Sequence, residues 1–183
     1  MIYHLSLQIA GIACGVFLLL VSGFFLAGST GARAAAGRFP RSKPIGVALL
    51  TIDLIWCFWL LATMEMGEFS VFRRPLFILL PIAFLLVLFF VDEFLAVRSL
   101  GILCLLAAEP LLDAAFLRYE TSRLFVTVFA YVLIVLGLLW VTMPYLLRDQ
   151  IRWSAQSSAR WRIIGGIGLL YAVAILACAF TQY

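Results

Sequence analysis

Six long apolar runs dominate the sequence and limit what the chain can fold into. An α-helix needs about 20 residues to cross the roughly 30 Å hydrocarbon core of a bilayer, and each run reaches or approaches that length. The runs are continuously apolar, whereas the strands of a membrane β-barrel alternate, so helices are expected. We therefore predict an all-α, polytopic integral membrane protein with six transmembrane helices in a compact bundle, forming one domain over residues 1–183. The predicted helices cover residues 5–27, 45–64, 75–91, 94–117, 124–147 and 163–180.

The composition excludes an ordinary soluble domain. Hydrophobic residues make up 66% of the chain and charged residues only 12%, whereas a soluble domain has roughly 25% charged residues. Little of the chain lies outside the six runs. Any function is therefore expected to depend on helix faces rather than on a soluble site.

The basic residues indicate an orientation. Of the 13, nine lie in one set of alternate connections and four in the other, so the positive-inside rule places the richer set in the cytoplasm and both termini outside. The segment before the first run has no Lys or Arg, which predicts a retained helix rather than a cleaved signal and favours a bacterial inner membrane. The nine are Arg33, Arg38, Arg41, Lys43, Arg98, Arg148, Arg152, Arg160 and Arg162; the four are Arg73, Arg74, Arg118 and Arg123.

Three acidic residues fall inside predicted helices and need a reason. They are Asp53, Glu109 and Asp113. An Asp near a helix centre costs about 2.5 to 3.5 kcal/mol on the insertion scale, while each large aliphatic residue returns about 0.3 to 0.6 kcal/mol. Asp53 is therefore expected to face protein or water rather than lipid.

One predicted helix carries a polar stripe. At about 100° per residue, Arg98 and Glu109 lie about 20° apart, and Asp113 is about 60° from Arg98. Counting depth from the start of each run, we predict an ion pair between Asp53 and Arg98, with Tyr171 at a similar depth as a further hydrogen-bond donor. Glu109 and Asp113 are expected nearer the outer face, where arginines would meet them: Arg73, Arg74, Arg118 or Arg123.

The segment 148–162 interleaves arginines with two tryptophans. Guanidinium groups and amphipathic aromatic rings both find partners in the headgroup layer, so contacts with anionic lipid or with a partner subunit are predicted. A role as a topology signal alone also explains the arginines. The candidate contact residues are Arg148, Arg152, Trp153, Arg160, Trp161 and Arg162.

Small residues indicate where helices approach one another closely. Gly11 and Gly15 are spaced as G-x-x-x-G, and a second set of small residues recurs along the last predicted helix. Small side chains allow two backbones to come together in membrane helix pairs. The second set is Gly165, Gly168, Ala172 and Ala179.

Several chemistries lack the residues they need. The single histidine, His4, is expected to be a solvated polar end, and it cannot supply paired haem ligation or a zinc motif. The only lysine, Lys43, is predicted in a loop, which disfavours a retinal Schiff base. No metal or cofactor is expected. Nucleic acid is not expected as a partner either, because the basic residues are spread through short connections.

Two functions remain open. The first is a non-catalytic membrane subunit or scaffold that binds lipids and other membrane subunits or a second copy of itself, because polar groups inside helices hold helices in register. The second is a small proton- or cation-coupled transporter or channel that uses the intramembrane carboxylates. No motif predicts an enzyme, although arginine-rich inner loops that hold phosphate headgroups would also suit a lipid-modifying one.

Overall fold

The chain forms helices connected by short turns. The computed structural model describes residues 5–91 and 93–182, so His4 lies outside the described residues. Within these ranges there are eight α-helices, two short 3₁₀-helices and no strand. Six helical segments are long and apolar enough to cross a membrane, in agreement with the six predicted runs. The elements are α1 (Leu7–Ala27), α2 (Thr30–Arg38), η1 (Phe39–Arg41), α3 (Lys43–Thr63), η2 (Gly67–Phe72), α4 (Arg73–Phe90), α5 (Leu95–Ala115), α6 (Arg123–Thr142), α7 (Tyr145–Ala155) and α8 (Ser158–Thr181).

The prediction of one helix over residues 124–147 is wrong at its end. The helix α6 ends at Thr142, and the separate helix α7 begins at Tyr145 directly after Pro144. Proline has no backbone N–H and suits a helix start, which explains the break. The predicted connection 148–162 is mostly helical, because α7 continues to Ala155 and α8 already begins at Ser158.

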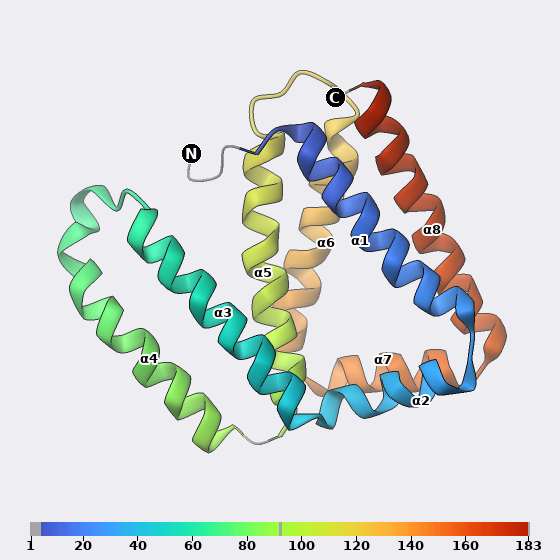
Figure 1. The fold of residues 1–183 in the computed structure, drawn as a ribbon, viewed down its shortest axis with the longest axis horizontal. Helices are drawn as coiled ribbons and strands as arrows, with labels where there is room; N and C mark the ends of the chain where they lie inside the picture. Colours follow the sequence, from blue (N-terminus) through green and yellow to red (C-terminus); the bar gives the residue numbers. More distant parts are fainter. Residues whose placement is uncertain (1–4, 92, 183) are drawn as a thin grey trace.

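Two short helices lie across one end of the molecule. In Figure 1, α2 and α7 run crosswise to the long helices, and they pack against each other. The buried residues of α7 are Leu147 and Ser154, so one side of α7 faces the protein. The first residues of α1 and the last residues of α8 lie at the opposite end (Figure 1). The two ends are called here the α2–α7 end and the terminal end.

Helices α1 and α8 pack as a close pair through small residues. A Cβ atom added to Gly15 would lie 2.4 Å from the side chain of Leu176, and one added to Gly165 would lie 2.9 Å from Cβ of Phe25. A Cβ atom on Gly168 would lie 2.5 Å from Oγ of Ser22. The small residues predicted to allow close approach therefore do so between helices of the same chain.

Glycines also join α5 to α6 and α3 to α5. A Cβ atom on Gly101 would lie 2.9 Å from the carbonyl oxygen of Gly137, which belongs to the facing helix. A Cβ atom on Gly46 of α3 would lie 2.7 Å from the backbone nitrogen of Ala96. These contacts involve backbone atoms on both sides, so they set how closely the helices approach.

The hairpin of α3 and α4 lies at the edge of the structure. Figure 1 shows α3 diverging from α5 towards the terminal end, with α4 on its far side. The helix α4 packs on α3 and η2, and the rings of Phe58 and Phe77 stack with centroids 5.7 Å apart. No described residue of α4 is buried. The main core instead joins α1, α5, α6 and α8.

Candidate functional site

Asp53 lies on the buried face of α3, as predicted for an acid that avoids lipid. Together with Gly46 and Leu50 it forms the buried stripe of this helix, and the residue is 3% exposed. Both carboxylate oxygens are buried, and neither accepts a hydrogen bond within the part of the chain that the structure describes. The thiols of Cys57 and Cys104 lie near it. Asp53 is thus a buried carboxylate without a partner among the described residues.

The predicted pair between Asp53 and Arg98 is not formed. The hydroxyl of Ser99 donates a hydrogen bond of 3.2 Å to the carbonyl oxygen of Gly46, so the two helices start at nearly the same level there. Asp53 is seven residues beyond Gly46, which places it about 10 Å farther along the helix axis. Gly46 also contacts Ala96, two residues before Arg98, so Arg98 lies about one and a half helical turns nearer the α2–α7 end than Asp53. The buried Nε of Arg98 has no hydrogen-bond partner among the described atoms.

Tyr171 is also not beside Asp53. Its hydroxyl donates a hydrogen bond of 2.7 Å to the carbonyl oxygen of Phe125 in α6. The helix α8 packs mainly on α1, so a similar depth along the membrane does not bring Tyr171 to α3. The hydrogen bond joins α8 to α6.

Glu109 and Asp113 line one hollow near the terminal end of α5. The hollow has a volume of about 570 Å³ and is otherwise apolar, with Ile134 of α6 and Phe116 at its wall. Glu109 is exposed, while one oxygen of Asp113 is buried without a hydrogen bond from the described residues. The arginines predicted to meet them form no ion pair with either acid within residues 5–91 and 93–182; one of these, Arg73, donates to the carbonyl oxygen of Met64.

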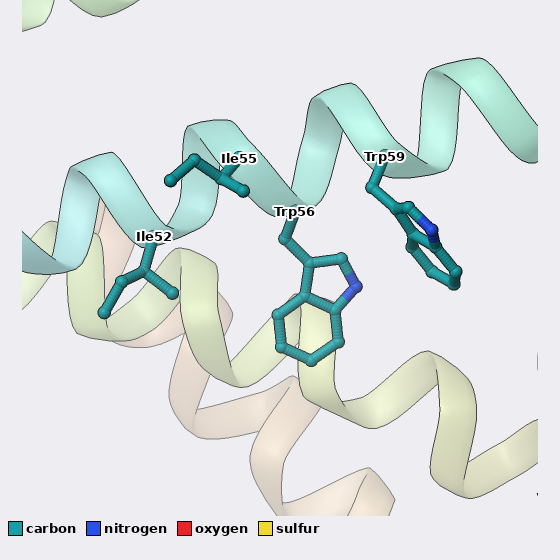
Figure 2. A pocket seen from close by; sticks show the side chains of 4 residues that line it. All are labelled: Ile52, Ile55, Trp56 and Trp59. Carbon is teal, nitrogen blue, oxygen red and sulfur yellow. The ribbon is translucent and has the colours of Figure 1, made fainter.

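An apolar cleft opens between α1, α3 and α5. Trp56 projects from α3 towards α5 (Figure 2), beside a groove on α3 that Ile52, Ile55 and Trp59 also line. The cleft has a volume of about 340 Å³ and is lined almost entirely by apolar atoms, including Phe17 of α1. The sequence does not predict this cleft, because no local pattern indicates that α3 and α5 diverge.

Arginines surround a second hollow, at the α2–α7 end. This arginine hollow has a volume of about 470 Å³ and lies between η1 and α7. Arg148 and Arg152 were predicted contact residues, whereas Arg41 was not singled out from the other basic residues of its connection. The lining includes Pro40, Arg41, Arg148, Ile151, Arg152 and Gln156.

The other predicted contact residues of segment 148–162 divide into two groups. Arg160, Arg162 and Trp153 are exposed, and the guanidinium of Arg160 lies 4.8 Å from the ring centroid of Trp153. Trp161 is fully buried, with its ring centroid 4.4 Å from that of Phe25. The prediction that Trp161 contacts headgroups is therefore wrong, because α8 begins early enough to turn this side chain against α1.

No family model, curated protein or solved structure matches the chain. Within residues 5–91 and 93–182, no group of three or more His, Cys, Asp or Glu residues is placed to hold a metal ion. The candidate site comprises Asp53, the apolar cleft beside it, the hollow lined by Glu109 and Asp113, and the arginine hollow.

Proposed function

We propose that the chain is an integral membrane protein and a non-catalytic subunit or scaffold of a larger membrane assembly. The observation that carries this proposal is the α3–α4 hairpin. The helix α4 buries no described residue, and the apolar cleft separates α3 from α1. Helices in a membrane associate through close packing rather than through hydrophobicity. A helix packed on a single long neighbour therefore has a free face that a partner helix can use.

The proposed orientation places the α2–α7 end in the cytoplasm of a bacterial cell. Five arginines lie on α2, η1 and α7 at this end, and an excess of basic residues is typical of cytoplasmic connections. An even number of spans then places both termini outside. The five are Arg33, Arg38, Arg41, Arg148 and Arg152.

Site-specific photocrosslinking in cells tests the subunit proposal. A photoreactive amino acid replaces Ile78 or Leu79 on α4, which are 64% and 57% exposed, and Leu170 on α8, which is 74% exposed, as the matched control. We expect protein adducts from the α4 positions and lipid adducts alone from Leu170. Lipid adducts alone from all three, together with recovery of a lone folded monomer in mild detergent, would contradict the proposal.

The buried carboxylate of Asp53 favours a second candidate, a proton- or cation-coupled transporter. Ionisable residues inside membrane helices are rare, and they commonly line proton or ion pathways. Asp53 sits between α3 and α5 close to the apolar cleft, and its oxygens accept no hydrogen bond from the described residues. A carboxylate in such a place is able to take up and release a proton as the two helices move apart.

Reconstitution into liposomes with an internal pH-sensitive dye tests this candidate. Flux by the unmodified chain that is lost in Asp53→Asn, and retained when exposed Glu120 is changed to Gln, would support transport. Absence of flux across a range of cation gradients, or flux unchanged by Asp53→Asn, would remove it. If Asp53→Asn loses assembly but keeps flux, Asp53 serves the assembly and not transport.

A further inference from the structure

The arginine hollow combines a concave shape with a concentration of positive charge. Its three guanidinium groups come from two elements that are far apart in the sequence: Arg41 from η1, and Arg148 and Arg152 from α7. Its volume of about 470 Å³ lies within the usual range for small-ligand sites. Between the arginines the wall is aliphatic, supplied by Pro40 and Ile151.

Most of the guanidinium donors at the arginine hollow have no acidic partner among the described residues. Asp149 forms an ion pair with Nε of Arg148 at 2.9 Å, which leaves the terminal nitrogens of that side chain. The guanidinium of Arg148 also lies 5.7 Å from the ring centroid of Phe94. Within the described residues no acidic group pairs with Arg41 or Arg152, and both are exposed. Within residues 5–91 and 93–182, a single acidic side chain, that of Asp149, therefore pairs with one of the three arginines.

The position of the hollow matches the phosphate layer of a membrane. It lies where α2, η1 and α7 cross the ends of the long apolar helices (Figure 1). Next to it, α3 begins its apolar span at Lys43 and α6 ends its span at Thr142. The ends of apolar spans mark the boundary between hydrocarbon and headgroups. The three arginines are therefore at the level where lipid phosphates occur.

We infer that the arginine hollow binds a phosphate group, presented by the headgroup of an anionic phospholipid. Arginine offers paired N–H donors that match phosphate oxygens, and basic pockets between helices on the cytoplasmic side are suited to anionic headgroups. The amide of Gln156 adds a donor at the rim, and the aliphatic wall suits the glycerol carbons. The inference rests on the proposed membrane location but not on the subunit or transport role.

Native mass spectrometry of the delipidated, folded chain in a neutral detergent tests this inference. The chain is titrated with phosphatidylglycerol and, in parallel, with phosphatidylcholine. We expect one phosphatidylglycerol to be retained in preference to phosphatidylcholine. The affinity is expected to fall about fivefold in Arg41→Gln and in Arg152→Gln, and about thirtyfold in the double variant. Arg148 is left unchanged because it also contacts Asp149 and Phe94.

Two control variants distinguish binding in the arginine hollow from general attraction of the lipid to surface charge. Arg160→Gln removes an exposed arginine on the same end but outside the hollow, and Arg118→Gln removes one at the terminal end. Neither is expected to change the retained lipid by more than about twofold, because a screened surface charge acts only over roughly 10 Å. An equal loss in Arg160→Gln and Arg152→Gln, or no preference for phosphatidylglycerol, would overturn the inference.

A competition experiment with soluble phosphates shows whether the bound phosphate belongs to a lipid headgroup or to a soluble molecule. Glycerol phosphate and inorganic phosphate are added to the complex with phosphatidylglycerol. Weak competition that needs a large excess supports a lipid ligand. Binding of glycerol phosphate in preference to the lipid, lost in the double variant, would keep the phosphate site but overturn the lipid assignment. Lipid retention is measured on the chain whether it is recovered alone or with a partner, so failure of the subunit proposal leaves these outcomes readable.

Discussion

The contact between Gly101 and Gly137 permits a quantitative test of the fold. A Cβ atom on Gly101 would lie 2.8 Å from Cγ2 of Val141, 2.9 Å from the carbonyl oxygen of Gly137 and 3.1 Å from the backbone nitrogen of Val141. Carbon contacts are optimal at about 3.5 to 4.0 Å. Two of these atoms belong to the backbone and cannot rotate away. Gly101→Ala therefore requires α5 and α6 to separate by roughly 0.6 Å or more.

The expected cost of Gly101→Ala is the cost of overpacking. Such an insertion in a packed core costs about 1 to 3 kcal/mol, so we expect the free energy of unfolding to fall by about 2 kcal/mol relative to a neutral Gly→Ala change. That difference is about thirtyfold in the ratio of folded to unfolded chain. Gly166→Ala is the matched control, because a Cβ atom there meets nothing within 4 Å.

Reversible unfolding with sodium dodecyl sulfate in mixed micelles, followed by tryptophan fluorescence, measures both variants. The comparison cancels the gain in helix propensity that alanine gives over glycine, because both glycines lie in helices. If Gly101→Ala and Gly166→Ala agree within about 0.5 kcal/mol, the usual scatter of surface substitutions, the close packing of α5 on α6 is refuted.

Three further predictions use the same unfolding assay on the isolated chain. Trp161→Ala should cost about 3 to 5 kcal/mol because it leaves a cavity, whereas exposed Trp153→Ala should cost less than about 1 kcal/mol; similar values would contradict the buried position of Trp161. Tyr171→Phe should cost about 1 kcal/mol by removing its hydrogen bond, while Tyr131→Phe should be neutral. Asp53→Leu should stabilise the chain by about 1 to 3 kcal/mol because it removes a buried carboxylate without a partner among the described residues; destabilisation would show that Asp53 has one.

The six long helices could be predicted because hydropathy is a local property. Each run is apolar over about the length that a membrane-crossing helix needs, and this can be read from the run itself, whatever it packs against. The short helices α2 and α7 were not predicted, because their mixed polar composition resembles a connection when it is judged by mean hydropathy. The helical spacing of apolar residues in α7 was available as a signal, since Leu147 and Ile151 are four residues apart and neither is exposed.

The site could be predicted only in part, because hydropathy gives the depth of a residue along its helix but not the partner that its side chain reaches. Asp53 was expected to avoid lipid, and it is buried. Its pairing with Arg98 required that both helices start at the boundaries of their hydrophobic runs. The contact of Gly46 with Ala96 agrees with this alignment to within about one residue, and it places Asp53 five residues, about 7.5 Å, beyond the level of Arg98. Depth alone does not show whether the guanidinium of Arg98 reaches the carboxylate of Asp53, and in the structure the two groups form no pair.

The distribution of close contacts explains why the two ends of α3 differ. Near the α2–α7 end, α3 is held on α5 by Gly46 and by the hydrogen bond from Ser99. Towards the terminal end the two helices diverge, and the space beside Trp56 is an apolar cleft. Asp53 lies between these regions. A hairpin anchored at one end can open at the other with little loss of contact, so Asp53 is the first buried polar group that such a movement would reach. The transport candidate therefore depends on this stretch of α3, where opening would expose the carboxylate, whereas the subunit proposal depends on the free face of α4.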